Sequence, residues 1–183
     1  QTCALPISYQ VVTYTADTIS LGSGVVVNLT GSNAVSLRTR NHGNLTLGTT
    51  INVNGGNDPS NVGGSGKAGG FDGGAMDVDG TGPGKGKTKS VDSGGGLQGG
   101  GAAFGGQGRD SDISYSLTYA TPALTNHLIG GSGGGGGNLY GGGAGGGAVE
   151  LFAHGDGALT ITSGGKILAN GGDTSTNHAQ SGG

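Results

Sequence analysis

Three short stretches of this chain contain residue types that could do chemistry, and the first of them is basic. Residues 84–88 read Gly-Lys-Gly-Lys-Thr, which resembles the end of a phosphate-binding loop. Such a loop also needs a glycine five residues before the Gly-Lys pair, and a following helix whose N-terminus faces the phosphate. Position 81 is Thr81, and residues 91–94 (Val-Asp-Ser-Gly) do not start a helix. A basic, solvated turn is therefore expected, and nucleotide binding is not.

The second stretch resembles the nucleophile turn of a hydrolase. Residues 130–134 read Gly-Gly-Ser-Gly-Gly, with Ser132 at the nucleophile position. The chemistry needs a strand–turn–helix around the serine, and nothing nearby predicts one. In a tract that is almost pure glycine the match arises by chance. The sequence therefore predicts no catalytic residue, and we expect that the protein is not an enzyme.

The third stretch concerns metal ligands. Residues 105–110 (Gly-Gly-Gln-Gly-Arg-Asp) match the opening of a calcium-binding nonapeptide, but there is one copy, and Asp112 stands where a large apolar residue belongs. Asp77 and Asp79 form a second acidic pair without the spacing of an EF-hand loop. The histidines share no ligand spacing; they are His42, His127, His154 and His178. Solvated carboxylates and exposed loop histidines are expected, with no metal and no cofactor.

The composition excludes several broad classes of protein. Glycine supplies 48 of the 183 residues, and charged residues are only 10%, against about 25% in ordinary globular domains. Collagen is excluded because the glycines do not recur at every third position and proline is scarce. A net charge of −3 offers no broad basic surface for nucleic acid. The longest branched-apolar run, residues 25–27, is far too short to span a bilayer, so membrane insertion is not expected.

The strongest pattern is a unit that occurs twice. Val35-Ser36-Leu37 is followed ten residues on by Leu45-Thr46-Leu47, as Val149-Glu150-Leu151 is by Leu159-Thr160-Ile161. Each copy then continues through a third short strand into Asn-Gly-Gly. One such unit cannot bury its own apolar face, so the pattern predicts an all-β parallel β-helix, or solenoid, in which 35–53 and 149–169 stack as adjacent coils. An antiparallel sandwich is the alternative. The stacking is expected to bury the apolar residues of both copies, which are Val35, Leu37, Leu45, Leu47, Ile51, Val53, Val149, Leu151, Leu159, Ile161 and Ile167.

Glycine-rich sequence separates the two copies. We expect solenoid coils over residues 9–57, a glycine-rich excursion over 58–147 with one strand near 113–119, another coil over 148–173, and the start of a second glycine-rich segment over 174–183. Ordering glycine is costly in backbone entropy. The tracts could be linkers, or extended helices of the polyglycine II kind whose backbones hydrogen-bond side by side. Apolar interruptions favour packing, since disordered segments usually lack them; they are Phe71, Leu97, Phe104, Leu139 and Tyr140.

The first eight residues are expected not to belong to the protein. Residues 1–8 correspond, in one reading frame, to the translated end of a common sequencing adapter. Segments of this kind are set aside before fold reasoning. Cys3, the only cysteine, lies in this segment, so we expect neither a disulfide nor thiol chemistry. The chain is expected to be an environmental fragment whose true termini lie beyond it.

The order of the blocks resembles glycine-rich secreted bacterial proteins of the adhesin or autotransporter-passenger kind. Residues 45–56, 68–74, 141–147 and 159–172 carry this resemblance. It implies a parallel β-helix with long glycine-rich insertions at the cell surface or outside the cell, with surface polysaccharide or other copies of the protein as partners. We expect a structural or adhesive role. The alternatives are a polysaccharide-binding or polysaccharide-degrading β-helix, which for cleavage needs clustered carboxylates, and an ice-binding protein, which needs a flat threonine ladder.

Overall fold

The described part of the chain is all-β. The structure is a computed structural model that describes residues 10–88, 99–104 and 128–174. Within these residues there is no helix. There are nine short strands: β1 (Val11–Ala16), β2 (Ile19–Leu21), β3 (Val27–Asn28), β4 (Ala34–Thr39), β5 (Leu45–Leu47), β6 (Thr50–Asn52), β7 (Val149–Phe152), β8 (Leu159–Ile161) and β9 (Lys166–Leu168). The strand expected near 113–119 lies outside the described residues.

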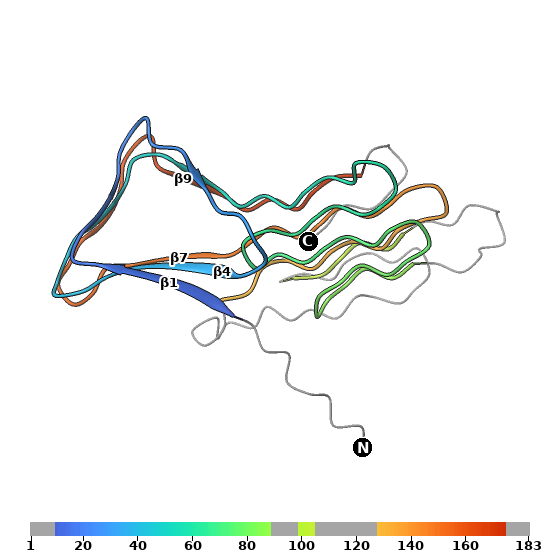
Figure 1. Ribbon diagram of the computed structural model, residues 1–183, viewed down its shortest axis with the longest axis horizontal. Coiled ribbons are helices and arrows are strands. Elements are labelled where there is room, and N and C mark those ends of the chain that lie inside the picture. Colours follow the sequence, from blue (N-terminus) through green and yellow to red (C-terminus); the bar gives the residue numbers. More distant parts are fainter. Residues whose placement is uncertain (1–9, 89–98, 105–127, 175–183) are drawn as a thin grey trace, which may run out of the picture.

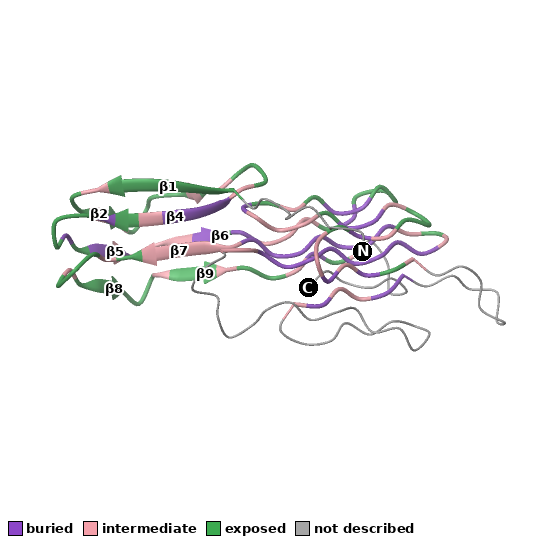
Figure 2. Cartoon of the chain, turned by 90° about the horizontal axis from the view of Figure 1, so that it is seen from below, coloured by how far each residue is buried: buried purple, intermediate pink, exposed green. Residues whose placement is uncertain are grey.

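The nine strands form three parallel sheets, with the orders β1-β4-β7, β2-β5-β8 and β3-β6-β9. Consecutive strands therefore lie in different sheets, and each strand pairs with the one three places along. We call β1–β3, β4–β6 and β7–β9 the first, second and third strand triplets. The triplets lie one above another, and together they trace a triangular outline (Figures 1 and 2). This arrangement is compatible with a parallel β-solenoid, and the antiparallel sandwich is wrong.

The predicted stacking of the two repeated units is confirmed residue by residue. Val35 pairs with Val149, Leu45 with Leu159 and Ile51 with Ile167. The first triplet continues the same ladder on the side of the second triplet opposite the third. Its matching positions place Val12 against Val35, Ile19 against Leu45 and Val27 against Ile51. Each apolar position therefore forms a column of three side chains through the stack.

Burial is concentrated in the second triplet, which has a neighbour on both sides. Leu45, Leu47, Ile51 and Val53 are all completely buried there. The expectation that the stacking would also bury the apolar residues of the second copy, which forms the third triplet, is wrong. Leu159, Ile161 and Ile167 remain 46%, 54% and 40% exposed, and Val149 and Leu151 are half-buried. The reason is position, because nothing in the described chain stacks on the outer side of the third triplet.

Glycine-rich segments project from the open side of the triangle and run beside one another (Figure 1). Backbone hydrogen bonds join them directly: Gly131 N–H donates to Gly146 O at 2.7 Å, Gly134 N–H to Gly143 O at 2.9 Å and Gly142 N–H to Gly74 O at 2.8 Å. Residues 130–137 and 141–147 are buried by this packing. Extended glycine backbone lying beside other glycine backbone is what the sequence predicts for 130–147.

One turn of the glycine-rich region closes the apolar core. Ala68 is completely buried and packs with Leu47, Ile51 and Val53. Its N–H donates to Gly31 O at 2.8 Å, and its carbonyl accepts from Ala148 N–H at 2.7 Å. The backbone there is left-handed, with φ of 47° at Ala68 and 87° at the following Gly69. The glycine-rich region and the strand triplets thus share one core.

Leu45 and Leu159 test the dependence of burial on position, because they are the same residue type at paired positions. We expect Leu45→Ala to lower the free energy of unfolding by about 2–5 kcal/mol, since it opens a cavity in a buried site. Leu159→Ala is expected to cost about 1 kcal/mol or less, as at an exposed site. Urea unfolding of both variants measures the difference. Equal losses would contradict this account of the core.

Glycine-to-alanine substitutions test the close backbone packing. A Cβ atom at Gly145 would lie 1.8 Å from the carbonyl oxygen of Gly131, whereas one at Gly22 would meet nothing within 4 Å. We expect Gly145→Ala to destabilise by about 1–3 kcal/mol or more, as overpacking does. Hydrogen exchange should also show reduced amide protection over residues 130–137. Gly22→Ala is the matched control and should leave both readouts unchanged; the same result for Gly145→Ala would contradict the packing.

Candidate functional site

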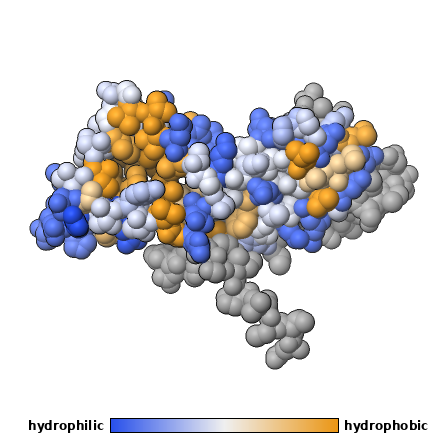
Figure 3. All heavy atoms as spheres, in the orientation of Figure 1, coloured by the Kyte–Doolittle hydropathy of each residue, from blue (hydrophilic) through white to orange (hydrophobic). Residues whose placement is uncertain are grey.

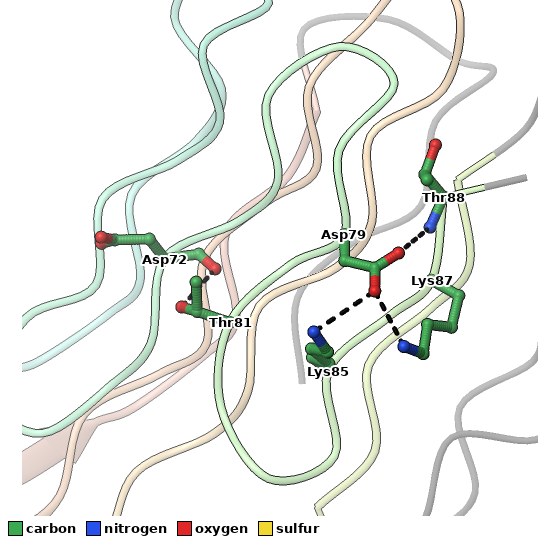
Figure 4. Close-up of polar contacts among 6 residues, drawn as sticks. All are labelled: Asp72, Asp79, Thr81, Lys85, Lys87 and Thr88. Atoms are coloured by element: carbon green, nitrogen blue, oxygen red, sulfur yellow. Dashed lines mark hydrogen bonds and ion pairs between the residues drawn. The ribbon is translucent and has the colours of Figure 1, made fainter.

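The basic stretch at residues 84–88 binds a carboxylate of its own chain (Figure 4). Lys87 Nζ lies 2.8 Å and Lys85 Nζ 3.3 Å from Asp79 Oδ2. The backbone N–H of Thr88 donates to the other oxygen, Asp79 Oδ1, at 2.8 Å. The Thr88 hydroxyl donates to Gly136 O at 2.9 Å. Residues 84–88, which resemble part of a phosphate-binding loop, therefore join neighbouring glycine-rich segments.

The ionisation of Asp79 reflects two opposing effects. Burial alone would raise the pKa of this carboxyl. The hydrogen bonds from Lys87, the Thr88 backbone and Lys85, together with the charge of Lys87, outweigh burial and hold the pKa of Asp79 below its ordinary value. The carboxylate is thus stabilised in its charged form. Of the acidic pair flagged in the sequence, Asp77 is exposed at a turn, with a left-handed φ of 58°.

Ser132 has surroundings different from those of His42 and His154, the two histidines among the described residues. Ser132 is completely buried, and its hydroxyl accepts the Gly84 N–H at 3.0 Å, which is a packing role. His42 and His154 come together at the β4–β5 and β7–β8 turns, with ring centroids 6.0 Å apart, and both are exposed as predicted. His42 Nδ1 lies 3.6 Å from Asp156 Oδ2. The sequence reasoning missed this proximity, although aligning the two repeated units would have placed these turns side by side.

An assembly of turns with exposed side chains lies at the far end of the described glycine-rich segments. Three turns meet there: residues 58–62, 76–78 and 137–140. Met76 N–H donates to Asn61 O at 3.0 Å, and Asp77 N–H donates to Gly137 O at 3.1 Å. The third turn closes on itself, with Gly137 N–H donating to Tyr140 O at 2.8 Å. We call this assembly the distal turns (right-hand side of Figure 1).

One buried carboxylate holds two of the distal turns together. Asp58 is only 2% exposed. Its Oδ1 accepts the N–H groups of Val62 and Gly63, and its Oδ2 accepts those of Asn61 and Gly141, each at 3.0 Å. Hydrogen bonds to a charged acceptor are stronger than neutral ones, and losing a partner inside a buried network is expensive. Asp58 therefore fixes the shape of the distal turns.

The distal turns expose apolar side chains. Val62, Met76, Val78 and Leu139 are between 46% and 65% exposed. Apolar side chains are visible at this end of the molecule in Figure 3. Leu139, one of the apolar interruptions of the glycine-rich tracts, is 57% exposed at a turn in which Gly137 N–H donates to Tyr140 O.

A cleft of about 250 Å³ lies where the sheets meet the glycine-rich segments, lined in part by Asn33, Phe71 and Asp72. Two of its lining residues, Asp72 and Thr81, bond to each other or to neighbouring backbone. The Asp72 carbonyl accepts both the backbone N–H and the hydroxyl of Thr81 at 2.9 Å, and Asp72 Oδ1 accepts Gly66 N–H at 2.6 Å. These bonds hold the turn around Phe71, so we take the distal turns rather than this cleft as the candidate site.

The pH dependence of stability in Asp79→Asn tests the carboxylate clamp, by which we mean Asp79 with its partners Lys85, Lys87 and Thr88. A carboxyl whose pKa is lowered by folding stabilises the protein above its unfolded pKa, and this contribution is lost as pH falls through the folded pKa. We therefore expect the wild type to be more stable than Asp79→Asn at neutral pH, with the difference disappearing in acid below the lowered pKa. Urea unfolding across pH measures it. Asp77→Asn removes the same charge from an exposed turn and should have little effect; a pH-independent gap for Asp79→Asn would contradict the clamp.

Among the described residues, no group of three or more His, Cys, Asp or Glu side chains could hold a metal ion. The same residues include no helix long and apolar enough to cross a membrane. No family model matches the sequence, and comparisons with curated proteins and with solved structures find no significant match.

Proposed function

We propose that this chain is a structural and adhesive segment of a secreted or cell-surface protein, and that it has no catalytic role. In this proposal the strand triplets are coils of a parallel β-solenoid, and the projecting tracts are polyglycine II-like helices. Support for the solenoid is the in-register pairing of each triplet with the next. Support for the polyglycine arrangement is direct bonding between glycine backbones, such as Gly134 N–H to Gly143 O.

The observation that carries the adhesive role is the construction of the distal turns. Two turns that are near in sequence meet a third that is about 60 residues further along; the three are joined by backbone bonds and by buried Asp58, and expose Val62, Met76, Val78 and Leu139. Exposing apolar side chains costs solubility, and rigid support lowers the entropy that binding loses. Both features suit a binding surface at the tip of a stiff projection.

Surface polysaccharide is the partner that this surface suits best. Sugar rings offer apolar C–H faces and hydroxyl groups at their edges. The apolar side chains of the distal turns are bordered by Ser60, Asn61 and Asn138, which supply hydroxyl and amide groups. Such a surface would contact C–H faces through the apolar residues and hydroxyls through the polar ones.

Two other functions are less well supported. Polysaccharide cleavage would need paired carboxylates free to act, but Glu150 accepts hydrogen bonds from Ser36 and Arg38 and forms an ion pair with Arg38 at 2.8 Å. One observation favours ice binding: Ser20, Thr46 and Thr160 pair in register and form one column of hydroxyl side chains. A flat array needs a second such column, and Gly48 stands beside Thr162 where it would form.

Polar substitutions at the distal turns test the proposal. We expect the variant with Val62→Ser, Met76→Gln and Leu139→Ser to lose at least about tenfold in affinity for immobilised surface polysaccharides, equivalent to about 1.4 kcal/mol. The control replaces Val25 and Val26, which are 45% and 79% exposed beside the sheets, with Ser. Binding is measured at dilute protein, with thermal unfolding to check the fold. No binding by the wild type, or equal binding by all three proteins, would refute the polysaccharide role.

A further inference from the structure

The outer edges of the first and third strand triplets are matched to each other. Leu45, Leu47 and Ile51 are completely buried in the second triplet, whereas their register partners Leu159, Ile161 and Ile167 are about half exposed. At the opposite end, Val12 and Tyr14 of the first triplet are 37% and 59% exposed. Among residues 10–88, 99–104 and 128–174, the same columns of the ladder are therefore filled in the middle and open at both ends.

If a first triplet from another copy is placed on the third triplet in the same register, an apolar residue meets an apolar residue in each of five columns. The register places Val12 in the column of Val149, Tyr14 in that of Leu151, Ile19 in that of Leu159, Leu21 in that of Ile161 and Val27 in that of Ile167. A first triplet laid on a third triplet would thus set each apolar side chain on another. Polar Ser20 would likewise follow polar Thr160 on the outer face.

The backbone pattern also continues without a shift. Ile19 N–H donates to Asn44 O at 3.0 Å, and one triplet further Leu45 N–H donates to Ala158 O at 2.9 Å. By the same step Leu159 N–H would meet the carbonyl of Thr18 in a following first triplet. An asparagine side chain also links neighbouring triplets, because Asn54 Oδ1 of the second accepts the Asn170 N–H that follows the third at 2.8 Å. Asn170 begins the Asn-Gly-Gly of its own copy, as Asn54 does, and is exposed.

We propose that copies of this chain associate head to tail, with the first triplet of one copy stacking in parallel on the third triplet of another. An unpaired sheet edge with exposed apolar residues is a ready template for further pairing. A contact between two different surfaces of the same molecule leaves one of each surface free, so association continues into open chains rather than stopping at a dimer. This inference is independent of the polysaccharide role, which is located at the distal turns.

A charged substitution in the third triplet tests the proposed contact between copies. We expect the full chain to show a mass that rises with concentration in sedimentation velocity and multi-angle light scattering. Leu159→Lys should weaken association at least about tenfold, because the stack would bury an unpaired charge. Thr160→Lys is the matched control: its register partner Thr46 lies between buried Leu45 and Leu47 and so faces outward, and it should associate like the wild type.

Disulfide trapping tests the register. In a Cys3→Ser background, Ser20→Cys and Thr160→Cys are separated within one copy by Thr46 but become neighbours across the proposed contact. Neighbouring strands about 5 Å apart are within disulfide reach. We expect oxidised ladders of dimers and larger species on non-reducing gels, and none from Thr13→Cys with Thr160→Cys, which lie in different sheets. A wild type that stays monomeric at all concentrations, association that Leu159→Lys does not weaken, or equal cross-linking of both cysteine pairs would overturn the proposal.

Discussion

Hydrogen bonding between neighbouring backbones is the constraint on which this structure depends. The glycine-rich segments have almost no side chains to bury, so their order must come from amides and carbonyls that meet across segments. Buried backbone groups must be paired, and the absence of Cβ atoms is what allows them to meet. Gly131 N–H bonds to Gly146 O at 2.7 Å, while a Cβ on the adjacent Gly145 would sit 1.8 Å from Gly131 O. Glycine here is therefore a packing requirement.

The same constraint ties the strand triplets to the glycine-rich segments. The chain leaves the second triplet after Val53 and returns at Val149, and the returning strand β7 pairs in register with β4, the first strand of the second triplet. Gly147 N–H donates to Val53 O at 2.7 Å, and Ala148 N–H donates to Ala68 O at 2.7 Å. The two ends of the long excursion are thus held together beside the core. Bringing the ends together costs loop-closure entropy, but that cost grows only slowly with the length of the insertion.

The sequence could predict those features that depend on local spacing. The ten-residue interval from Val35 to Leu45, and from Val149 to Leu159, was enough to pair the second and third triplets. It could not reveal that Leu45 is buried and Leu159 exposed, because the two residues are alike and differ only in their place in the stack. The role of Asp58 was equally invisible, since one of its four donors, Gly141, lies 83 residues away. Long-range contacts of this kind leave no local pattern.

Charge is scarce in this chain, and several of the described acidic residues lie outside the strands, where no backbone ladder fixes the conformation. Asp17, at the β1–β2 turn, bonds to Arg40 at the β4–β5 turn, Asp79 binds two lysines, and Asp58 caps the distal turns. Glu150 differs, because it lies in β7 and bonds to Arg38 of the paired strand β4. Strands and glycine segments are held by repeated backbone hydrogen bonds, but a turn has no repeated ladder. A carboxylate that accepts several N–H groups, as Asp58 does, fixes the conformation of a turn instead. Turn residues that make no such bonds, including the exposed apolar ones, are then open to vary in identity without disturbing the support beneath them.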